Sequence, residues 1–246
     1  MNLNLAFYII VGFIAQLIDG ALGMAYGVSS TSLLLSMGVS PGAASASVHA
    51  SELVTTAVSG VSHLKFGNVD KGLLKRLMIP GILGGAIGAY ILSELDGKNI
   101  KPFVSGYLMI MGILILWKAF KKVQENRVRT KIIPLGLFGG FFDAIGGGGW
   151  GPIVTTTLVA RGNNPRLTIG SVNLAEFFVT VSESIVFALT IGFVHWKIII
   201  GLMIGGVLAA PLAALVCARI PRRPLMILVG ILIVGLSIRT LLLTLP

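Results

Sequence analysis

Long, mainly apolar stretches recur along the whole chain, and their lengths predict membrane-spanning helices. A helix needs about 20 residues to cross a hydrocarbon core of about 30 Å. Six stretches of roughly this length alternate with short polar segments: 41–63, 73–95, 102–120, 165–193, 198–218 and 224–245. We expect each of them to be a full transmembrane helix.

Two further apolar regions, residues 5–38 and 132–162, are interrupted in the middle by glycines. The interruptions begin directly after Asp19 and Asp143, which are followed by Gly-Ala-Leu-Gly and by Ala-Ile-Gly-Gly-Gly-Gly. Each half of these regions holds only about 12–14 residues, which is too short to cross the membrane alone. We therefore expect a broken, re-entrant pair of short helices in each region.

The two interrupted regions are copies of each other at a fixed offset of 124 residues. Eleven positions match without a gap: 19/143, 23/147, 27/151, 31/155, 34/158, 38/162, 41/165, 47/171, 48/172, 52/176 and 56/180. A chance match between apolar stretches would reuse Leu or Gly, but it would rarely reuse Asp, Pro and Glu together. The sequence therefore predicts one membrane domain made of two repeats, 1–124 and 125–246.

The composition excludes a soluble protein. Hydrophobic residues make up 55% of the 246 residues, charged residues make up 11%, and the mean hydropathy is +0.94. Soluble domains carry about 25% charged residues, and a soluble chain of this size could not hide so much apolar surface. A secreted enzyme, a cytosolic dinucleotide-binding protein and a nucleic-acid-binding domain are ruled out as first interpretations. The single cysteine, Cys217, excludes an intrachain disulfide.

The net charge of +10 is explained by cytoplasmic loops, because no basic stripe interleaved with aromatic residues is present. If both interrupted regions are hairpins, each repeat has three full spans and the second repeat is inverted. One face then holds 15 of the 19 basic residues: Lys65, Lys71, Lys75, Arg76, Lys118, Lys121, Lys122, Arg127, Arg129, Lys131, Arg161, Arg166, Arg219, Arg222 and Arg223. Full crossing of both regions would move the last five of these outside. The hairpin arrangement therefore predicts both termini outside and residues 118–131 in the cytoplasm.

Five of the nine acidic residues lie within apolar stretches: Asp19, Glu52, Asp143, Glu176 and Glu183. A charge at the bilayer centre costs at least about 2.5–3.5 kcal/mol, so such residues face a cavity or the bundle interior, or are protonated. Asp19 and Asp143 have a structural interpretation, in which they accept the free N–H groups of the half-helix after each break. In the functional interpretation, they couple or gate transport together with Glu52 and Glu176.

Polar side chains form a stripe on one face of the helix expected at 41–63 and on its copy. The first stripe consists of Ser45, His49, Glu52, Thr56, Ser59 and His63, and the second of Asn173, Glu176, Thr180 and Glu183. Hydrogen bonds between helices would explain Ser and Thr, but Glu is a costly choice for that purpose. We expect Glu52 and Glu176 to line a cavity. His49 can carry a proton near neutral pH, whereas Asn173 replaces it in the second repeat.

Glycines at the two breaks predict an anion site made of backbone groups. Half-helix N-termini near the midplane offer free N–H groups and a partial positive charge of about half a unit each. Inverted repeats would bring two such breaks together. We expect the anion to be bound by Gly23, Gly27, Gly146, Gly147, Gly148 and Gly149, with side-chain groups from Ser47, His49, Ser171 and Asn173.

Motifs for catalysis are missing from the sequence. There is no Gly-Lys-Ser/Thr phosphate loop and no Gly-x-Ser-x-Gly nucleophile elbow. His49 and Glu52 form an i, i+3 pair, but one imidazole and one carboxylate make a poor metal site without further ligands. We therefore expect neither an enzyme nor a bound metal or cofactor.

Several segments form a specific combination when they are taken together. They are the duplicated interrupted region, Gly-Gly-Gly-Gly-Trp-Gly-Pro (146–152), Ser-Val-His-Ala-Ser-Glu (47–52), Ser-His-Leu-Lys-Phe-Gly-Asn-Val (62–69) and Gly-Ser-Val-Asn-Leu-Ala-Glu (170–176). Over its whole length the chain resembles the sulfite exporter TauE/SafE family of membrane permeases. The resemblance implies transport, often outward, of a small sulfur-containing anion such as sulfite, a sulfonate or thiosulfate. One departure is the first break, which has Gly-Ala-Leu-Gly-Met-Ala where the second has its run of glycines.

We therefore expect an all-α polytopic membrane protein that acts as a secondary transporter for such an anion, coupled to protons through alternating access. Repulsion between a carboxylate and a bound anion favours proton uptake, which links the two. The alternative is a cation-coupled carrier or a cation channel in which the four repeated acids bind the ion. Expected partners are the small anion, protons and the lipid bilayer, but no nucleic acid, and a homo-oligomer is left open. Short loops suit a bacterial inner membrane.

Overall fold

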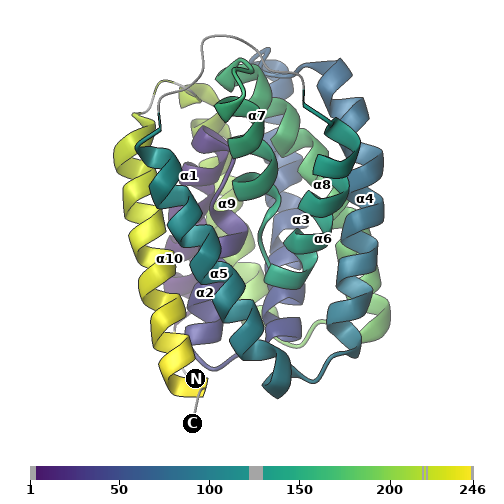
Figure 1. Ribbon diagram of the computed structural model, residues 1–246, viewed down its shortest axis with the longest axis vertical. Coiled ribbons are helices and arrows are strands. Elements are labelled where there is room, and N and C mark those ends of the chain that lie inside the picture. The colour runs from purple at the N-terminus through teal and green to yellow at the C-terminus, as the bar shows by residue number, and fades with distance from the viewer. Residues whose placement is uncertain (1–3, 122–129, 218, 220, 245–246) are drawn as a thin grey trace.

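The computed structural model describes the chain except for residues 1–3, 122–129, 218, 220 and 245–246, and except for the side chain of Arg222. Within the described ranges every regular element is a helix, and the helices pack side by side along the longest axis of the molecule (Figure 1). In chain order they are α1 (Leu5–Leu22), α2 (Tyr26–Ser36), α3 (Pro41–Lys65), α4 (Lys71–Glu94), α5 (Gly97–Ala119), α6 (Ile132–Gly146), the π-helical turn η1 (Gly151–Thr155), α7 (Thr156–Ala160), α8 (Pro165–Thr190), α9 (Trp196–Val216) and α10 (Arg222–Thr244). Six helices are long and apolar enough to cross a membrane. The expected all-α polytopic membrane protein is confirmed.

The two ends of the bundle are occupied by different parts of the chain. α1 begins and α10 ends at one end, which we call the terminal end (Figure 1). α5 ends and α6 begins at the opposite end, which we call the linker end. The long helices α3, α4, α5, α8, α9 and α10 run between the two ends.

Each interrupted region enters and leaves at the same end of the bundle. α1 runs parallel to α9, with Gly12 facing Leu202 and Gly20 facing Ala213, before the chain turns back into α2. α6 runs parallel to α4 in the same way, and the chain then returns through η1 and α7 to the linker end (Figure 1). Glycines at these contacts let the helix backbones approach closely. The geometry is that of two re-entrant hairpins.

The helix contacts keep their pattern when the two predicted repeats are exchanged. α1 packs along α9 as α6 packs along α4, and α3 packs on α9 as α8 packs on α4. α3 packs against its own counterpart α8, and α5 against its counterpart α10. Two inverted repeats require this pattern. The repeats 1–124 and 125–246 themselves stay a prediction, and their boundary lies outside the described residues.

Two expectations about individual helices are wrong. The first half of each interrupted region is longer than 12–14 residues, with 18 residues in α1 and 15 in α6. Each of these helices continues for another turn past its aspartate, so the break does not directly follow Asp19 or Asp143. The second halves are shorter, with 11 residues in α2 and five each in η1 and α7. α1 therefore counts among the six apolar helices of spanning length, while α3, which carries a polar stripe, does not.

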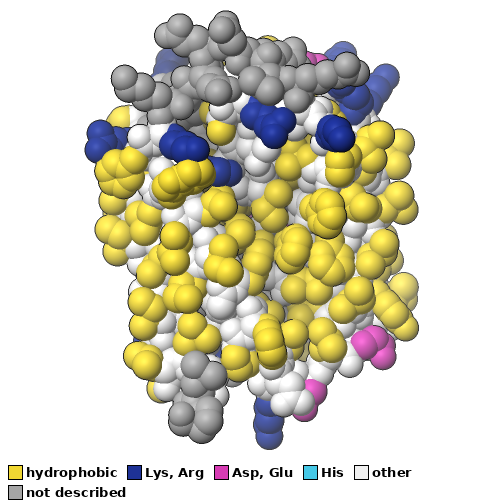
Figure 2. Space-filling view, viewed as in Figure 1, with side chains coloured by type: hydrophobic (Ala, Val, Ile, Leu, Met, Phe, Trp, Pro, Cys, Tyr) yellow, Lys and Arg dark blue, Asp and Glu magenta, His cyan; other side chains and the backbone are white. Residues whose placement is uncertain are grey.

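The surface separates into an apolar belt and two polar ends. On the face shown in Figure 2, hydrophobic side chains cover the middle of the molecule, most of the Lys and Arg lie toward the linker end, and most of the visible acidic side chains lie toward the terminal end. Leu189 and Leu242 are 81% and 76% exposed, which suits contact with lipid rather than water. The positive-inside rule expects this charge distribution for a cytoplasmic linker end. Of the basic residues assigned to that face, Lys122, Arg127 and Arg129 lie outside the described residues, as does the side chain of Arg222.

Candidate functional site

Both interrupted regions turn at a glycine. Gly23 caps the C-terminus of α1 and Gly147 that of α6, and both residues have the left-handed conformation, with φ of 70° and 62°. Gly148 follows with φ of 146°, which only glycine adopts easily. In the first repeat Ala25 has φ of 112°, a strained value for a residue with a Cβ. The second break therefore depends on glycine, whereas the first contains a strained alanine.

Asp19 and Asp143, which the offset of 124 residues relates, accept hydrogen bonds from backbone N–H groups at these breaks. Asp143 Oδ1 accepts hydrogen bonds from the N–H of Gly149 at 2.6 Å and of Trp150 at 2.9 Å. Asp19 Oδ1 accepts one from the N–H of Tyr26 at 3.4 Å. These are the donors that a helix start leaves free. Both aspartates thus have the capping geometry of the structural interpretation.

The two breaks touch each other inside the bundle. A Cβ added to Gly27 would lie 2.6 Å from the Cα of Gly148. Thr31 Oγ1 donates a hydrogen bond to the carbonyl oxygen of Gly147 at 2.5 Å, and so ties α2 to the second break. The breaks can meet only because Gly27 and Gly148 have no side chains. If the two breaks lie together as expected, they have to make a contact of this kind.

Beside the breaks, three carboxylates converge on one imidazole. His49 Nε2 lies 2.9 Å from Glu183 Oε2, 3.6 Å from Asp143 Oδ2 and 3.9 Å from Glu52 Oε2. His49 and Glu52 come from α3, Asp143 from α6 and Glu183 from α8. All four side chains are buried, and those of His49 and Glu183 are fully buried. We call these four residues the His49 centre.

His49 and Glu183 make the closest contact of the centre, 2.9 Å between Nε2 and Oε2. His49 Nδ1 lies 2.8 Å from the carbonyl oxygen of Ser45. Because a carbonyl oxygen only accepts hydrogen bonds, Nδ1 carries a hydrogen. Nε2 then meets Glu183 either as an N–H group facing a carboxylate or as a lone pair facing a protonated carboxyl. Either arrangement would place a proton at this 2.9 Å contact, although neither Nε2 nor Oε2 has a hydrogen-bond partner as the side chains are oriented.

The His49 centre is short of positive charge. Asp19 and Glu176 are further buried acids, and no lysine or arginine is buried in the part of the chain that the structure describes. Four carboxylate oxygens of the centre have no hydrogen-bond partner: Glu52 Oε2, Asp143 Oδ2, Glu183 Oε1 and Glu183 Oε2. Unpaired ionised carboxylates are strongly disfavoured in such surroundings. Protons or another positive species therefore have to offset the charge.

Of the residues expected to bind or couple, His49, Glu52 and Asp143 meet in this centre. Glu183 makes the shortest contact with His49, although it is not among those expected residues. Its signal in the sequence is the polar stripe of the second repeat, which places it on the same helix face as Glu176. The duplication does not mark it, because the equivalent position in the first repeat is Ser59.

Ser47 and Ser171 are not brought into the centre. Ser47 Oγ donates to the carbonyl oxygen of Ala43, and Ser171 Oγ to that of Leu167, both at 2.6 Å. Ser171 Oγ also accepts a hydrogen bond from the N–H of Asp70 at 2.7 Å. These hydroxyls are engaged near the starts of their own helices.

The other expected binding residues lie around the centre. Gly146 and Gly149 face Tyr107 of α5, whose ring stacks on Phe142. Asn173, the counterpart of His49, accepts a hydrogen bond from Ser59 Oγ at 2.9 Å. Asn173 therefore meets a neutral hydroxyl where His49 meets carboxylates.

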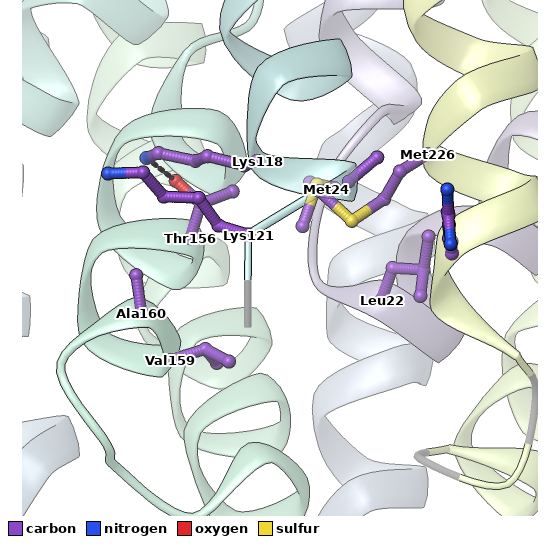
Figure 3. A pocket seen from close by; sticks show the side chains of 10 residues that line it. Leu22, Met24, Lys118, Lys121, Thr156, Val159, Ala160 and Met226 are labelled. Atoms are coloured by element: carbon purple, nitrogen blue, oxygen red, sulfur yellow. Dashed lines mark hydrogen bonds between the residues drawn. The ribbon is translucent and has the colours of Figure 1, made fainter. Parts of the chain in front are cut away.

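A cavity of about 210 Å³ lies toward the linker end, next to the first break. Leu22 and Met24, which flank the turn of the first hairpin, form part of its wall (Figure 3). Lys118, Lys121 and Arg223 line it as well, whereas none of its described lining residues is acidic. The cavity thus joins a positively charged rim to the tip of a helix break.

The cations of this cavity are held by groups other than carboxylates. Lys118 Nζ donates a hydrogen bond to Thr156 Oγ1 (Figure 3). Lys121 Nζ lies 3.6 Å from the centre of the Trp117 ring, a cation–π contact. Their charge is therefore free to attract an anion.

Known proteins are similar to this chain over nearly its whole length. The family model described as sulfite exporter TauE/SafE matches residues 8–240. This chain belongs to the sulfite exporter TauE/SafE family. A curated relative, the probable membrane transporter protein YtnM of Bacillus subtilis (strain 168), is 45% identical over 248 residues, which cover 97% of this chain and 83% of the relative. No solved structure matches the chain.

Membership of the TauE/SafE family confirms the resemblance seen in the sequence. Together with six apolar helices of spanning length, it makes the chain an integral membrane protein and a membrane transporter. A bacterial plasma membrane agrees with the Bacillus relative. The expectations of no metal, no cofactor and no catalysis stay predictions.

Proposed function

We propose that this TauE/SafE protein is a secondary transporter that moves a small sulfur-containing anion together with protons. The observation that carries the proposal is the His49 centre, one imidazole with three carboxylates, buried where the two helix breaks meet. The family description points to sulfite, and sulfonates and thiosulfate share its oxyanion chemistry. Inverted repeats around a central site would give alternating access by rocking of one repeat against the other.

Electrostatic repulsion links the anion to protons. An anion cannot enter a region with five buried carboxylates unless some of them are neutral. Protonation of the His49 centre removes this repulsion, and by linkage the bound anion favours the protonated state. Proton and anion are therefore expected to move in the same direction.

The backbone amides at the breaks are the proposed anion donors, and the aspartates gate them. Asp143 occupies the N–H groups of Gly149 and Trp150, and Asp19 occupies that of Tyr26. An anion therefore has to compete with a carboxylate for the same donors. The anion would take these donors only when the carboxylate moves away from them, so each aspartate controls access to its own amides.

The cavity at the linker end is the proposed entry site for the anion. Lys118, Lys121 and Arg223 supply positive charge there, and its wall reaches the tip of the first hairpin at Met24. A positively charged cleft raises the local concentration of anions. From this cavity the anion would have to pass the contact between the two breaks to reach the His49 centre.

The second candidate is a cation-coupled carrier or cation channel. It is favoured by the excess of buried acids, since Asp19, Glu52, Asp143 and Glu176 could bind a cation directly. This candidate predicts flux of a cation that does not respond to sulfite. The basic cavity at the linker end argues for the anion.

Sulfite flux into proteoliposomes under an imposed pH gradient tests the proposal, with empty liposomes as control. We expect saturable flux that follows the gradient, and we expect Glu52→Gln to abolish the pH-driven part while the protein stays folded. Unchanged pH-driven flux in Glu52→Gln would remove this residue from the coupling. Cation flux without any flux of sulfite, thiosulfate or sulfonate would favour the second candidate.

A further inference from the structure

The offset of 124 residues relates two side-chain contacts between α3 and α8. It pairs His49 with Asn173, and Ser59 with Glu183. Both members of each exchanged pair touch: His49 Nε2 lies 2.9 Å from Glu183 Oε2, and Ser59 Oγ lies 2.9 Å from Asn173 Oδ1. The same position in the helix crossing is thus built twice, once with groups that titrate and once with groups that do not.

We propose that this transporter has a single proton-exchange centre, the His49–Glu183 pair, and that Ser59–Asn173 is its permanently neutral counterpart. This inference rests on the proposed function, and it identifies the group that takes up the proton and the number of protons held in each cycle. One proton is held on this pair in each cycle, although the chain has two repeats. The centre lies to one side of the axis that would exchange the repeats.

The residues around the His49–Glu183 pair also favour a titratable contact, unlike the equivalent residues around Ser59–Asn173. The groups that face His49 are Glu52 and Ser45 from α3, Asp143 from α6 and Glu183 from α8. From α4, Gly85 gives Glu183 its space, since a Cβ there would lie 2.6 Å from Glu183 Oε1. In the other repeat, the position equivalent to Gly85 is Ala209, and the position equivalent to Glu183 is the smaller Ser59. The chain therefore accommodates a glutamate on one side only.

This asymmetry separates two acids that the duplication makes equal. Glu52 and Glu176 occupy equivalent positions, but only Glu52 lies near the imidazole, at 3.9 Å. Glu176 shares its helix face with Asn173 instead. Glu52 therefore contacts the imidazole of the proton-exchange centre, whereas Glu176 does not make this contact.

Each member of the pair can be replaced by its own counterpart, which provides matched variants. Glu183→Ser and His49→Asn, alone and together, convert the titratable contact into a second copy of the neutral one. Ser59→Ala and Glu176→Gln are the controls from the other side. We expect thiosulfate flux into proteoliposomes to lose its response to a pH gradient in the first set, at least about tenfold, and to keep it in the controls. Retained response in the double variant, or equal loss in Glu176→Gln, would overturn the proposal.

A readout without substrate separates this inference from the proposed function. Protein labelled with ¹⁵N-histidine in lipid nanodiscs gives ring-nitrogen signals for its three histidines, and His49→Asn assigns those of His49. We expect Glu183→Gln to change the pH titration of the His49 signals, and Ser59→Ala and Glu176→Gln to leave it unchanged. If the pH titration of the His49 signals is the same in Glu183→Gln as in the wild-type protein, the proposed proton-exchange centre is wrong, even if the protein carries anions. A Glu183-dependent titration without flux of any sulfur anion would support the centre and overturn the proposed function.

Discussion

At the scale of single residues, the His49 imidazole holds together side chains that would otherwise repel each other. Glu52, Asp143 and Glu183 all point oxygens at its Nε2. Removing one partner from such a buried group leaves the others uncompensated, which typically costs 3–5 kcal/mol. Variants in this centre therefore have to be compared with controls for folding as well as for flux.

Glycine 148 offers a prediction at the same scale. Gly148→Ala should destabilise the protein, because its φ of 146° disfavours a side chain at a cost of about 1–3 kcal/mol. The collision of the new Cβ with the backbone of Gly27 and Val28 adds to this cost. Gly106→Ala is the control, since nothing lies within 4 Å of a Cβ at that position. Thermal unfolding in detergent measures both. Equal melting temperatures for the two variants would contradict the close contact between the breaks.

Residue-level chemistry was only partly predictable from the sequence. Repetition marked Asp19, Asp143, Glu52 and Glu176, because an acid kept at the same offset stands out in an apolar stretch. Glu183 carries no such mark, and only the crossing of α3 over α8 reveals it as the partner of His49. A contact between two repeats depends on how they pack, which a stripe on one helix does not specify.

At the scale of elements, the sequence predicts the breaks of the two hairpins, but it does not predict the lengths of their half-helices. Their glycines and their offset predict the breaks, and the structure places the breaks in contact at Gly27 and Gly148. The half-helix lengths differ from expectation, because α1 and α6 continue past their aspartates and end at Gly23 and Gly147. An aspartate that caps the next helix can sit inside the preceding one, and sequence spacing alone does not distinguish the two positions.

The cavity between the first hairpin, α5, α7 and α10 leads to a prediction about anion entry. Lys118→Met should raise the KM for anion entering from the linker end by roughly tenfold or more, because a hydrogen bond between a charged group and the anion is worth about 1.5–3 kcal/mol. Lys75→Met is the control, since Lys75 lies at the same end but does not line the cavity. Initial flux rates at varied thiosulfate concentration give the KM values. Equal KM values for both variants would exclude this cavity as the entry site.

At the scale of the whole molecule, charge and hydrophobicity define an orientation in the membrane. The apolar belt separates a basic linker end from a terminal end that carries acidic side chains (Figure 2). The sequence predicted this division from the positive-inside rule together with the hairpins. Although the helix contacts survive exchange of the repeats, most of the basic residues lie at one end of the fold.

Cysteine labelling tests this orientation. In a Cys217→Ala background, Lys98→Cys should react with a membrane-impermeant maleimide on intact cells, because α5 begins at the terminal end. Lys131→Cys should react only after the membrane is permeabilised, because it precedes α6 at the linker end. Labelling in the opposite order would place the linker end outside and reject the assignment by the positive-inside rule.

Proton movement driven by the anion is the most direct test of the central claim, that a sulfur anion and a proton pass together through the His49 centre. The measurement is the internal pH of proteoliposomes, read with an enclosed dye, after thiosulfate is added outside without any imposed gradient. Thiosulfate suits this test because its acid is strong and does not cross lipid in neutral form. The claim predicts internal acidification in the wild-type protein, and none beyond that of empty liposomes in the His49→Asn, Glu183→Ser double variant. Thiosulfate uptake without internal acidification in the wild-type protein would contradict the claim.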